Sequence, residues 1–150
     1  MTTFPPEVAA ALTGRPTAGQ LDQAFPLLTA DPTGLVDVCL LSRTEIEPVA
    51  GGVRVVVVST KARRNLAATR RATLLAVCDD AAHYLGLELG RSIEAEGVLT
   101  AELAIVRALR DDVGVELHPL RFRVDTSLEV AERWDRTAAL LTRLGATAHT

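Results

Sequence analysis

The stretch from Val53 to Cys78, VRVVVVSTKARRNLAATRRATLLAVC, constrains the fold of this chain more than any other. It includes four consecutive valines, Val55–Val58, and an unbroken β-branched run predicts a strand that is buried on both faces. Ser59 and Thr60 follow, and hydroxyl residues favour the start of a helix. Good helix formers then fill residues 61–71, before the pattern returns to strand. We therefore expect a strand, a short helix and a second strand.

Positive charge is concentrated in the same stretch. Between Glu47 and Asp79 the sequence has no carboxylate, although the chain as a whole has a formal net charge of −3. Hydroxyl groups, free N–H groups at a helix start and clustered basic side chains suit an anion, most simply a phosphate. A solvated basic helix face is the alternative interpretation. The basic residues are Arg54, Lys61, Arg63, Arg64, Arg70 and Arg71.

The composition narrows the class of protein. With 150 residues, 48% hydrophobic and 23% charged, we expect one globular domain over residues 1–150. Aromatic residues make up only 3%, which disfavours a surface that stacks on bases, so we do not expect a nucleic-acid partner. The alternative for the basic residues is a nucleic-acid-binding module that uses the arginines at 63, 64, 70 and 71.

The N-terminus lacks the basic and apolar regions of a signal peptide, and no apolar run is long enough for a membrane span. Cys39 and Cys78 lie in expected strands, so we interpret them as buried, unpaired thiols. These features indicate a cytoplasmic location and no membrane partner. The spacing of histidines and cysteines matches no metal motif, and we expect no metal site.

Local patterns predict the remaining elements. We expect a helical turn at 21–24, a single long strand at 35–49, and a loop at 90–97. Residues 98–110 fit either a helix or a strand, and we choose a strand. The other expected elements are a helix starting at Pro5–Glu7, strands at 25–30, 84–89 and 117–124, and a C-terminal helix that begins in a capping box at Thr126–Glu129 and ends at Gly145.

Six or seven strands connected by hairpins and flanked by helices predict a mainly β fold. A small antiparallel barrel is the economical architecture, because closure hides the edges of a sheet. The barrel would occupy residues 25–125, after an N-terminal helical segment (1–20) and before a C-terminal helix (127–145).

Three segments resemble the pyridoxamine 5′-phosphate oxidase-like family, the FMN-binding split barrels. The segments are FPLLTADPTGLVDVCLLS, VRVVVVSTKARRNLAATRRATLLAV and LRFRVDTSLEVAERW. The resemblance implies a six- or seven-stranded antiparallel split β-barrel with a C-terminal helix. It also implies a homodimer with the cofactor sites at its interface.

The resemblance further implies a phosphate loop for FMN after the valine strand. Thr60 matches the loop hydroxyl, Lys61 the first basic position, and Asn65 the family's Asn-Leu pair. Ala62 stands where a second basic residue is usual, so Arg63 or Arg64 would supply that charge. The full set of candidate cofactor-binding residues is Ser42, Val58, Ser59, Thr60, Lys61, Arg63, Arg64 and Asn65, with Arg43 a weaker candidate beside Ser42.

The expected function is therefore that of an FMN-binding flavoprotein, with a flavin-dependent oxidation or reduction of a small molecule as its activity. No catalytic residue is assigned. A true pyridoxamine 5′-phosphate oxidase is not expected, because the longer C-terminal region of those enzymes has no counterpart here. The alternative is a split-barrel dimer that binds no cofactor or a different one, such as F420 or haem.

Overall fold

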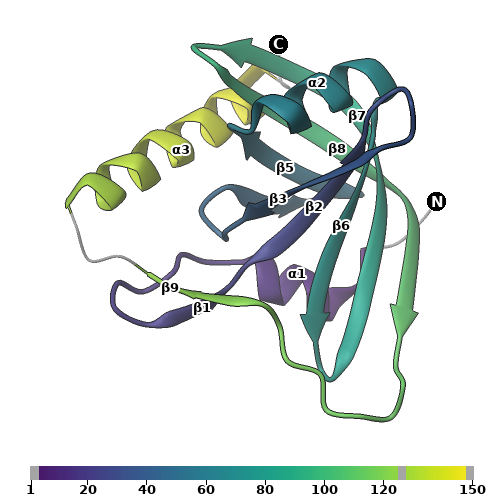
Figure 1. Ribbon diagram of the computed structural model, residues 1–150. Coiled ribbons are helices and arrows are strands. Elements are labelled where there is room, and N and C mark those ends of the chain that lie inside the picture. The colour runs from purple at the N-terminus through teal and green to yellow at the C-terminus, as the bar shows by residue number, and fades with distance from the viewer. Residues whose placement is uncertain (1–3, 125–127, 148–150) are drawn as a thin grey trace.

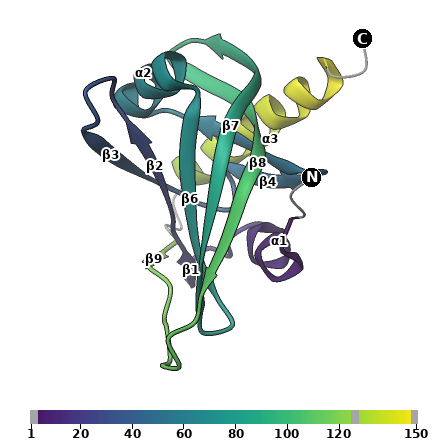
Figure 2. The same cartoon turned by 90° about the vertical axis from the view of Figure 1, so that its right-hand side faces the viewer.

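The computed structural model describes residues 4–124 and 128–147, and its centre is a seven-stranded antiparallel sheet. The sheet curls into a half-barrel, with helix α1 and helix α2 at its opposite ends and helix α3 beside it (Figures 1 and 2). The strand order is β3-β2-β6-β7-β8-β5-β4. The sheet strands are β2 (Phe25–Ala30), β3 (Val36–Leu41), β4 (Ile46–Val49), β5 (Gly52–Val57), β6 (Arg71–Cys78), β7 (Ala81–Ala95) and β8 (Val98–Asp111). The helices are α1 (Pro6–Leu12), α2 (Thr60–Thr69) and α3 (Leu128–Thr147). The mainly β fold expected from the sequence is confirmed.

The valine-rich strand β5 is buried on both faces, as predicted. Val53, Val55 and Val57 are fully buried, and Val56 is 2% exposed because its other face is covered by α3. Each such side chain contributes roughly 1.5–3 kcal/mol to folding through burial. Val58 differs from the others, since it leaves the strand and is 61% exposed.

The predicted long strand at 35–49 is wrong, because a corner at Ser42–Glu45 divides it into β3 and β4. In this corner the Glu45 N–H donates to the Ser42 carbonyl (3.0 Å), and the Ser42 N–H donates to Glu45 Oε1 (3.0 Å). These local hydrogen bonds replace the bonds of a strand ladder. The two halves then lie at opposite edges of the sheet.

The prediction of a loop at 90–97 is also wrong. Strand β7 continues to Ala95 and pairs with β8 across a tight turn at Glu96-Gly97, where both residues have positive φ (55° and 76°). Such a turn matches the twist of a long hairpin. The charged residues before it therefore lie on an extended strand. The prediction of a strand at 98–110 is confirmed.

A second, two-stranded sheet pairs β1 (Leu21–Gln23) with β9 (Arg121–Arg123). The helical turn expected at 21–24 is therefore wrong. The strand expected at 117–124 is reduced to these three residues of β9, which lie outside the seven-stranded sheet. Pro119 has no N–H to donate to a ladder, which favours a short strand.

Helix α3 carries Leu141 and Leu144 on its buried face. It continues past Gly145 to Thr147, so the prediction that Gly145 ends it is wrong. A Cβ at Gly145 would lie 2.9 Å from Arg54 Nη1, so the glycine permits close contact with β5. The capping box at 126–129 lies outside the described residues. Among the described residues, no helix is long and apolar enough to cross a membrane.

Candidate functional site

Helix α2 begins directly after Val58 with a capped and electropositive first turn. Ser59 is its N-cap, and the Ser59 hydroxyl accepts a hydrogen bond from the Ala62 N–H (3.3 Å). The Arg63 N–H bonds to the Ser59 carbonyl (3.0 Å), as in a regular helix. The N–H groups of Thr60 and Lys61 therefore have no partner within the helix. The first turn has no acidic residue, so the positive end of the helix dipole is not offset there.

The basic side chains of the stretch do not form one cluster. Arg54 bonds to Glu102 (3.0 Å) and Glu47 (3.3 Å), and Arg70 donates to the Leu89 carbonyl (2.8 Å), so both are directed away from the α2 start. Three cations remain on the first half of α2: Lys61, Arg63 and Arg64.

These three cations differ in how they are held. Arg63 pairs with Glu94 (2.9 Å), donates to the Val58 carbonyl (3.3 Å) and contacts the Thr60 hydroxyl (3.4 Å). Arg64 is exposed and forms no ion pair with any residue that the structure describes. Lys61 is 77% exposed. Only Arg63 therefore has a fixed position.

A carboxylate that the sequence interpretation missed lies beside these cations. Asp37, on β3, is 3.8 Å from the Lys61 ammonium and accepts a hydrogen bond from the Asn65 side chain (2.9 Å). Asn65 is buried and also donates to the Thr29 hydroxyl (3.0 Å). Asn65 thus connects α2 to β2 and β3. Asp37 shares the inner face of β3 with Cys39 and Leu41. The alternation of exposed and less exposed residues along this strand is the sequence signal that could have placed Asp37 there.

Two hollows adjoin the β3–β4 corner, and the larger of this pair, about 710 Å³, opens beside Val58. Its walls are mainly apolar, with a polar group at the β3–β4 corner. Ser42 and Val58 line it, whereas the six other candidates, from Ser59 to Asn65, do not. The lining residues are Ala24, Leu40, Leu41, Ser42, Thr44, Glu45, Val56, Val58, Glu96, Val98, Phe122, Arg136, Thr137 and Leu140.

The polar group of this hollow consists of Ser42, Thr44 and Glu45. The Ser42 hydroxyl contacts the Thr44 hydroxyl and lies 3.0 Å from Glu45 Oε1. Burial raises the pKa of the Glu45 carboxyl above its ordinary value, although the hydrogen bonds from Ser42 oppose the shift. A glutamate in this environment, at the wall of a hollow, is a candidate functional group.

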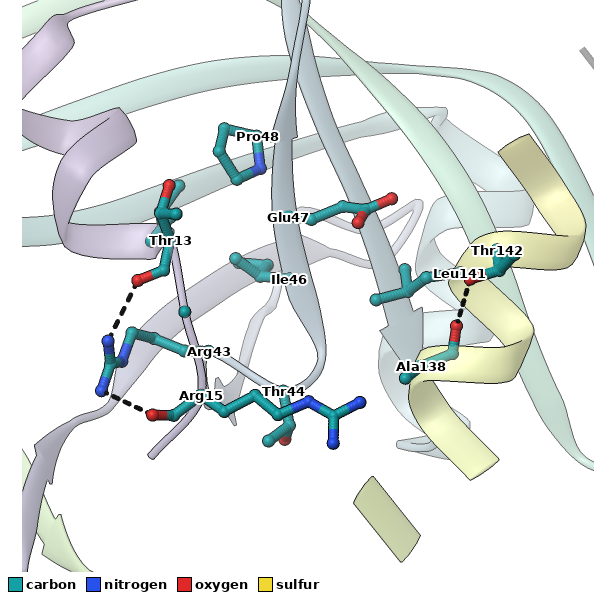
Figure 3. Close-up of a pocket in the computed structure, with 12 residues that line it drawn as sticks. Thr13, Arg15, Arg43, Thr44, Ile46, Glu47, Pro48, Ala138, Leu141 and Thr142 are labelled. Atoms are coloured by element: carbon teal, nitrogen blue, oxygen red, sulfur yellow. Dashed lines mark hydrogen bonds between the residues drawn. The ribbon is translucent and has the colours of Figure 1, made fainter. Parts of the chain in front are cut away.

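The smaller hollow, about 450 Å³, lies between the end of α1, the start of β4 and α3. Figure 3 shows the Arg43 guanidinium bonded to the carbonyls of Thr13 (3.0 Å) and Arg15 (3.1 Å), on the wall opposite Leu141 of α3. Arg43 also pairs with Asp22 (2.9 Å). Arg43 therefore holds the N-terminal segment against the corner, and four hydrogen bonds already engage its guanidinium.

Two further expectations concern metals and thiols. The residues that the structure describes contain no group of three or more His, Cys, Asp or Glu side chains that could hold a metal ion. Cys39 and Cys78 are unpaired, as predicted, although each is only partly buried. Burial raises the pKa of both thiols to about 11, which makes them weak nucleophiles at neutral pH.

No family model and no curated protein matches the sequence. Several solved structures nevertheless have a fold similar to that of this chain. An FMN-binding protein from Syntrophomonas wolfei subsp. wolfei superposes with a TM-score of 0.52 at 13% identity, over 75% of this chain and 87% of that one. The haem storage protein HutZ from Vibrio cholerae gives 0.53 at 12%, over 77% and 100%. An F420 reductase gives 0.51 at 11%, over 69% and 98%. The chain therefore has the split-barrel fold of these proteins, as the sequence resemblance implied.

Proposed function

We propose that this protein binds FMN, with the flavin ring in the larger hollow and the phosphate at the start of α2. The observation that carries the proposal is the continuity of the two features: Val58 lines the hollow, and the next residue, Ser59, caps the helix. An apolar slot for a ring thus leads directly to N–H groups and cations suited to a phosphate. A volume of about 710 Å³ is within the usual range for ligand pockets.

The activity we propose is a flavin-dependent oxidation or reduction of a small molecule. Bound FMN would supply the redox chemistry, while the protein would orient the ring and exclude water from it. Lys61 and Arg64 would pair with the phosphate, and the Thr60 hydroxyl would donate to it. The proposal assigns no catalytic side chain. The haem and F420 proteins that share the fold leave those two cofactors as alternatives.

We further propose that the protein is a homodimer whose partner covers β3 and the mouth of the hollow. Strand β3 is an edge strand, and its outward side chains are apolar and more than half exposed. Exposed apolar patches of this kind mark interaction surfaces. The valine strand β5 is itself buried and contributes nothing to this exposed surface. The exposed residues are Leu35, Val36, Val38, Leu40 and Val58, of which the last two also line the hollow.

The phosphate site is tested by comparing FMN with riboflavin, which has the same ring but no phosphate. A charge-assisted hydrogen bond is worth roughly 1.5–3 kcal/mol, so Lys61→Ala or Arg64→Ala should weaken FMN binding about tenfold or more. Riboflavin binding should stay unchanged. Titration of each ligand, followed by quenching of flavin fluorescence, measures both constants.

Arg71→Ala is the matched control, because Arg71 is exposed at the start of β6, beyond the far end of α2. Arg70 is unsuitable, since it caps the helix in the left-handed conformation (φ 61°) and bonds to the Leu89 carbonyl. Equal loss of FMN and riboflavin in the two α2 variants would contradict a phosphate contact. A wild-type protein whose absorption spectrum shows haem or F420, and which does not take up FMN, would contradict the cofactor.

A further inference from the structure

The carboxylate of Glu45 is held at one oxygen and open at the other. Oε1 accepts two hydrogen bonds, from the Ser42 N–H and the Ser42 hydroxyl, each 3.0 Å long. Oε2 accepts none from the residues that the structure describes. Glu45 is half-buried and lines the larger hollow. An acceptor oxygen is therefore available beside the ligand space.

The corner itself does not require this charge. Both bonds from Ser42 end on a single oxygen, and the amide oxygen of a glutamine could accept them equally well. A half-buried carboxylate without a cationic partner costs free energy that a neutral side chain would avoid. The raised pKa of Glu45 reflects this cost. A binding role for the open oxygen would account for a charged residue at this position.

The surroundings indicate which chemical group would meet the open oxygen. An oxygen that can only accept hydrogen bonds requires a donor, and the walls around it are apolar, with Leu40, Val56 and Val98 among them. A flat ring that carries an N–H group on its edge satisfies both conditions. The ring of oxidised flavin has a single N–H, at N3.

We infer that Glu45 recognises the ligand of the larger hollow by accepting a hydrogen bond from a ring N–H, which in a flavin is N3–H. This inference rests on the proposed function, because it takes a flavin ring to be the occupant. Glu45 would then be a specificity-determining residue. Its recognition would be independent of the phosphate at α2, which lies at the other end of the ligand.

The test measures the binding of two ligands to wild-type protein and to a Glu45 variant. Riboflavin and 3-methylriboflavin differ only in the N3 hydrogen, and neither carries a phosphate. In wild-type protein the methyl group should weaken binding at least tenfold, because it removes the donor that Glu45 accepts. In Glu45→Gln the Ser42 donors hold the amide oxygen, so the NH₂ group faces the ligand. Riboflavin should then bind at least tenfold more weakly, and the two ligands should bind alike.

Glu96→Gln is the matched control, because Glu96 lines the same hollow but is 83% exposed and pairs with Arg136. It removes the same charge and should preserve the discrimination between the two ligands. Circular dichroism of each variant reports whether the fold is intact. Equal discrimination in wild-type and Glu45→Gln protein would overturn the inference and leave the proposed function standing. Failure of folded wild-type protein to bind either FMN or riboflavin would overturn both.

Discussion

At the scale of single residues, Glu45 and Glu102 carry the same side chain in opposite environments. Burial raises the pKa of Glu45 above its ordinary value. Hydrogen bonds from Arg91, reinforced by those from Arg54, hold the pKa of Glu102 below its ordinary value despite partial burial. Arg91 Nη2 approaches Glu102 to 2.6 Å and Arg54 Nε to 3.0 Å. The ionised form is therefore unfavourable at Glu45 and favourable at Glu102.

This contrast predicts opposite effects of pH on two neutralised variants. The protonated form of Glu45 is compatible with its buried position, whereas the ionised form destabilises the folded state. The stability contributed by protonation is fully present below the unfolded pKa of about 4.3 and is lost as the pH rises through the raised folded pKa. Glu45→Gln should therefore be more stable than wild type at pH 7.5 and no more stable near pH 4. Glu102 adds stability above the unfolded pKa and loses it as the pH falls through its lowered folded pKa. Glu102→Gln should be less stable at pH 7.5, by about 1 kcal/mol, and should converge with wild type towards pH 3.

Urea denaturation at several pH values measures both differences in the free energy of unfolding. A loss of stability in Glu45→Gln at pH 7.5 would mean that the corner needs the carboxylate for folding. In that case the charge would have a structural explanation, and a ligand would not be required to account for it.

At the scale of elements, the contact between β3 and α2 decides how strongly an anion can bind at the helix start. Asp37 already faces Lys61 and Asn65, so a phosphate at that position would meet a negative charge. We expect Asp37→Asn to tighten FMN binding several-fold relative to riboflavin. Asparagine can still accept the Asn65 bond, so the packing of α2 should survive. The ratio of the two dissociation constants measures the effect.

Glu94→Gln provides the comparison, because Glu94 pairs with Arg63 but is itself 56% exposed. Its effect on the same ratio should be smaller, since solvent screens an exposed charge. An unchanged ratio in Asp37→Asn would show that the phosphate lies away from Asp37, and the α2 start would then need a different occupant.

The same elements show what local sequence can predict. The β5–α2–β6 stretch was predicted because each part carries its own signal: a β-branched run, a hydroxyl cap and a return to alternation. The Ser42–Glu45 corner was missed because its apolar flanks continue the strand pattern, while side-chain bonds decide the break. The partner of Lys61 was missed because Asp37 is distant in sequence and becomes a neighbour only through the register of β3 against β2. Ser42 was predicted as a site residue, but Glu45 beside it was not.

At the scale of the whole molecule, the apolar outer face of β3 predicts a dimer. Sedimentation at micromolar concentration should show twice the chain mass of 16.0 kDa. Val38→Glu should produce a monomer, because it would place an unpaired charge in the proposed interface. Val115→Glu changes a valine of similar exposure, 56% against 57%, outside the seven-stranded sheet, and should remain dimeric. Sedimentation of the wild-type protein as a monomer would contradict the proposed dimer, and no partner subunit would then cover the ligand site.

The placement of β3 and β4 at opposite edges of the sheet has a consequence for the order of folding. The hairpins β2–β3, β4–β5 and β7–β8 each join neighbouring segments of the chain, so each can form early. The larger hollow, by contrast, lies at the corner that joins β3 and β4 and also takes Val98 from β8, Phe122 from β9 and Leu140 from α3, so it is complete only when segments distant in sequence have packed together. Partly folded chains therefore lack the hollow, and any ligand that fills it selects the completed barrel and stabilises it by mass action.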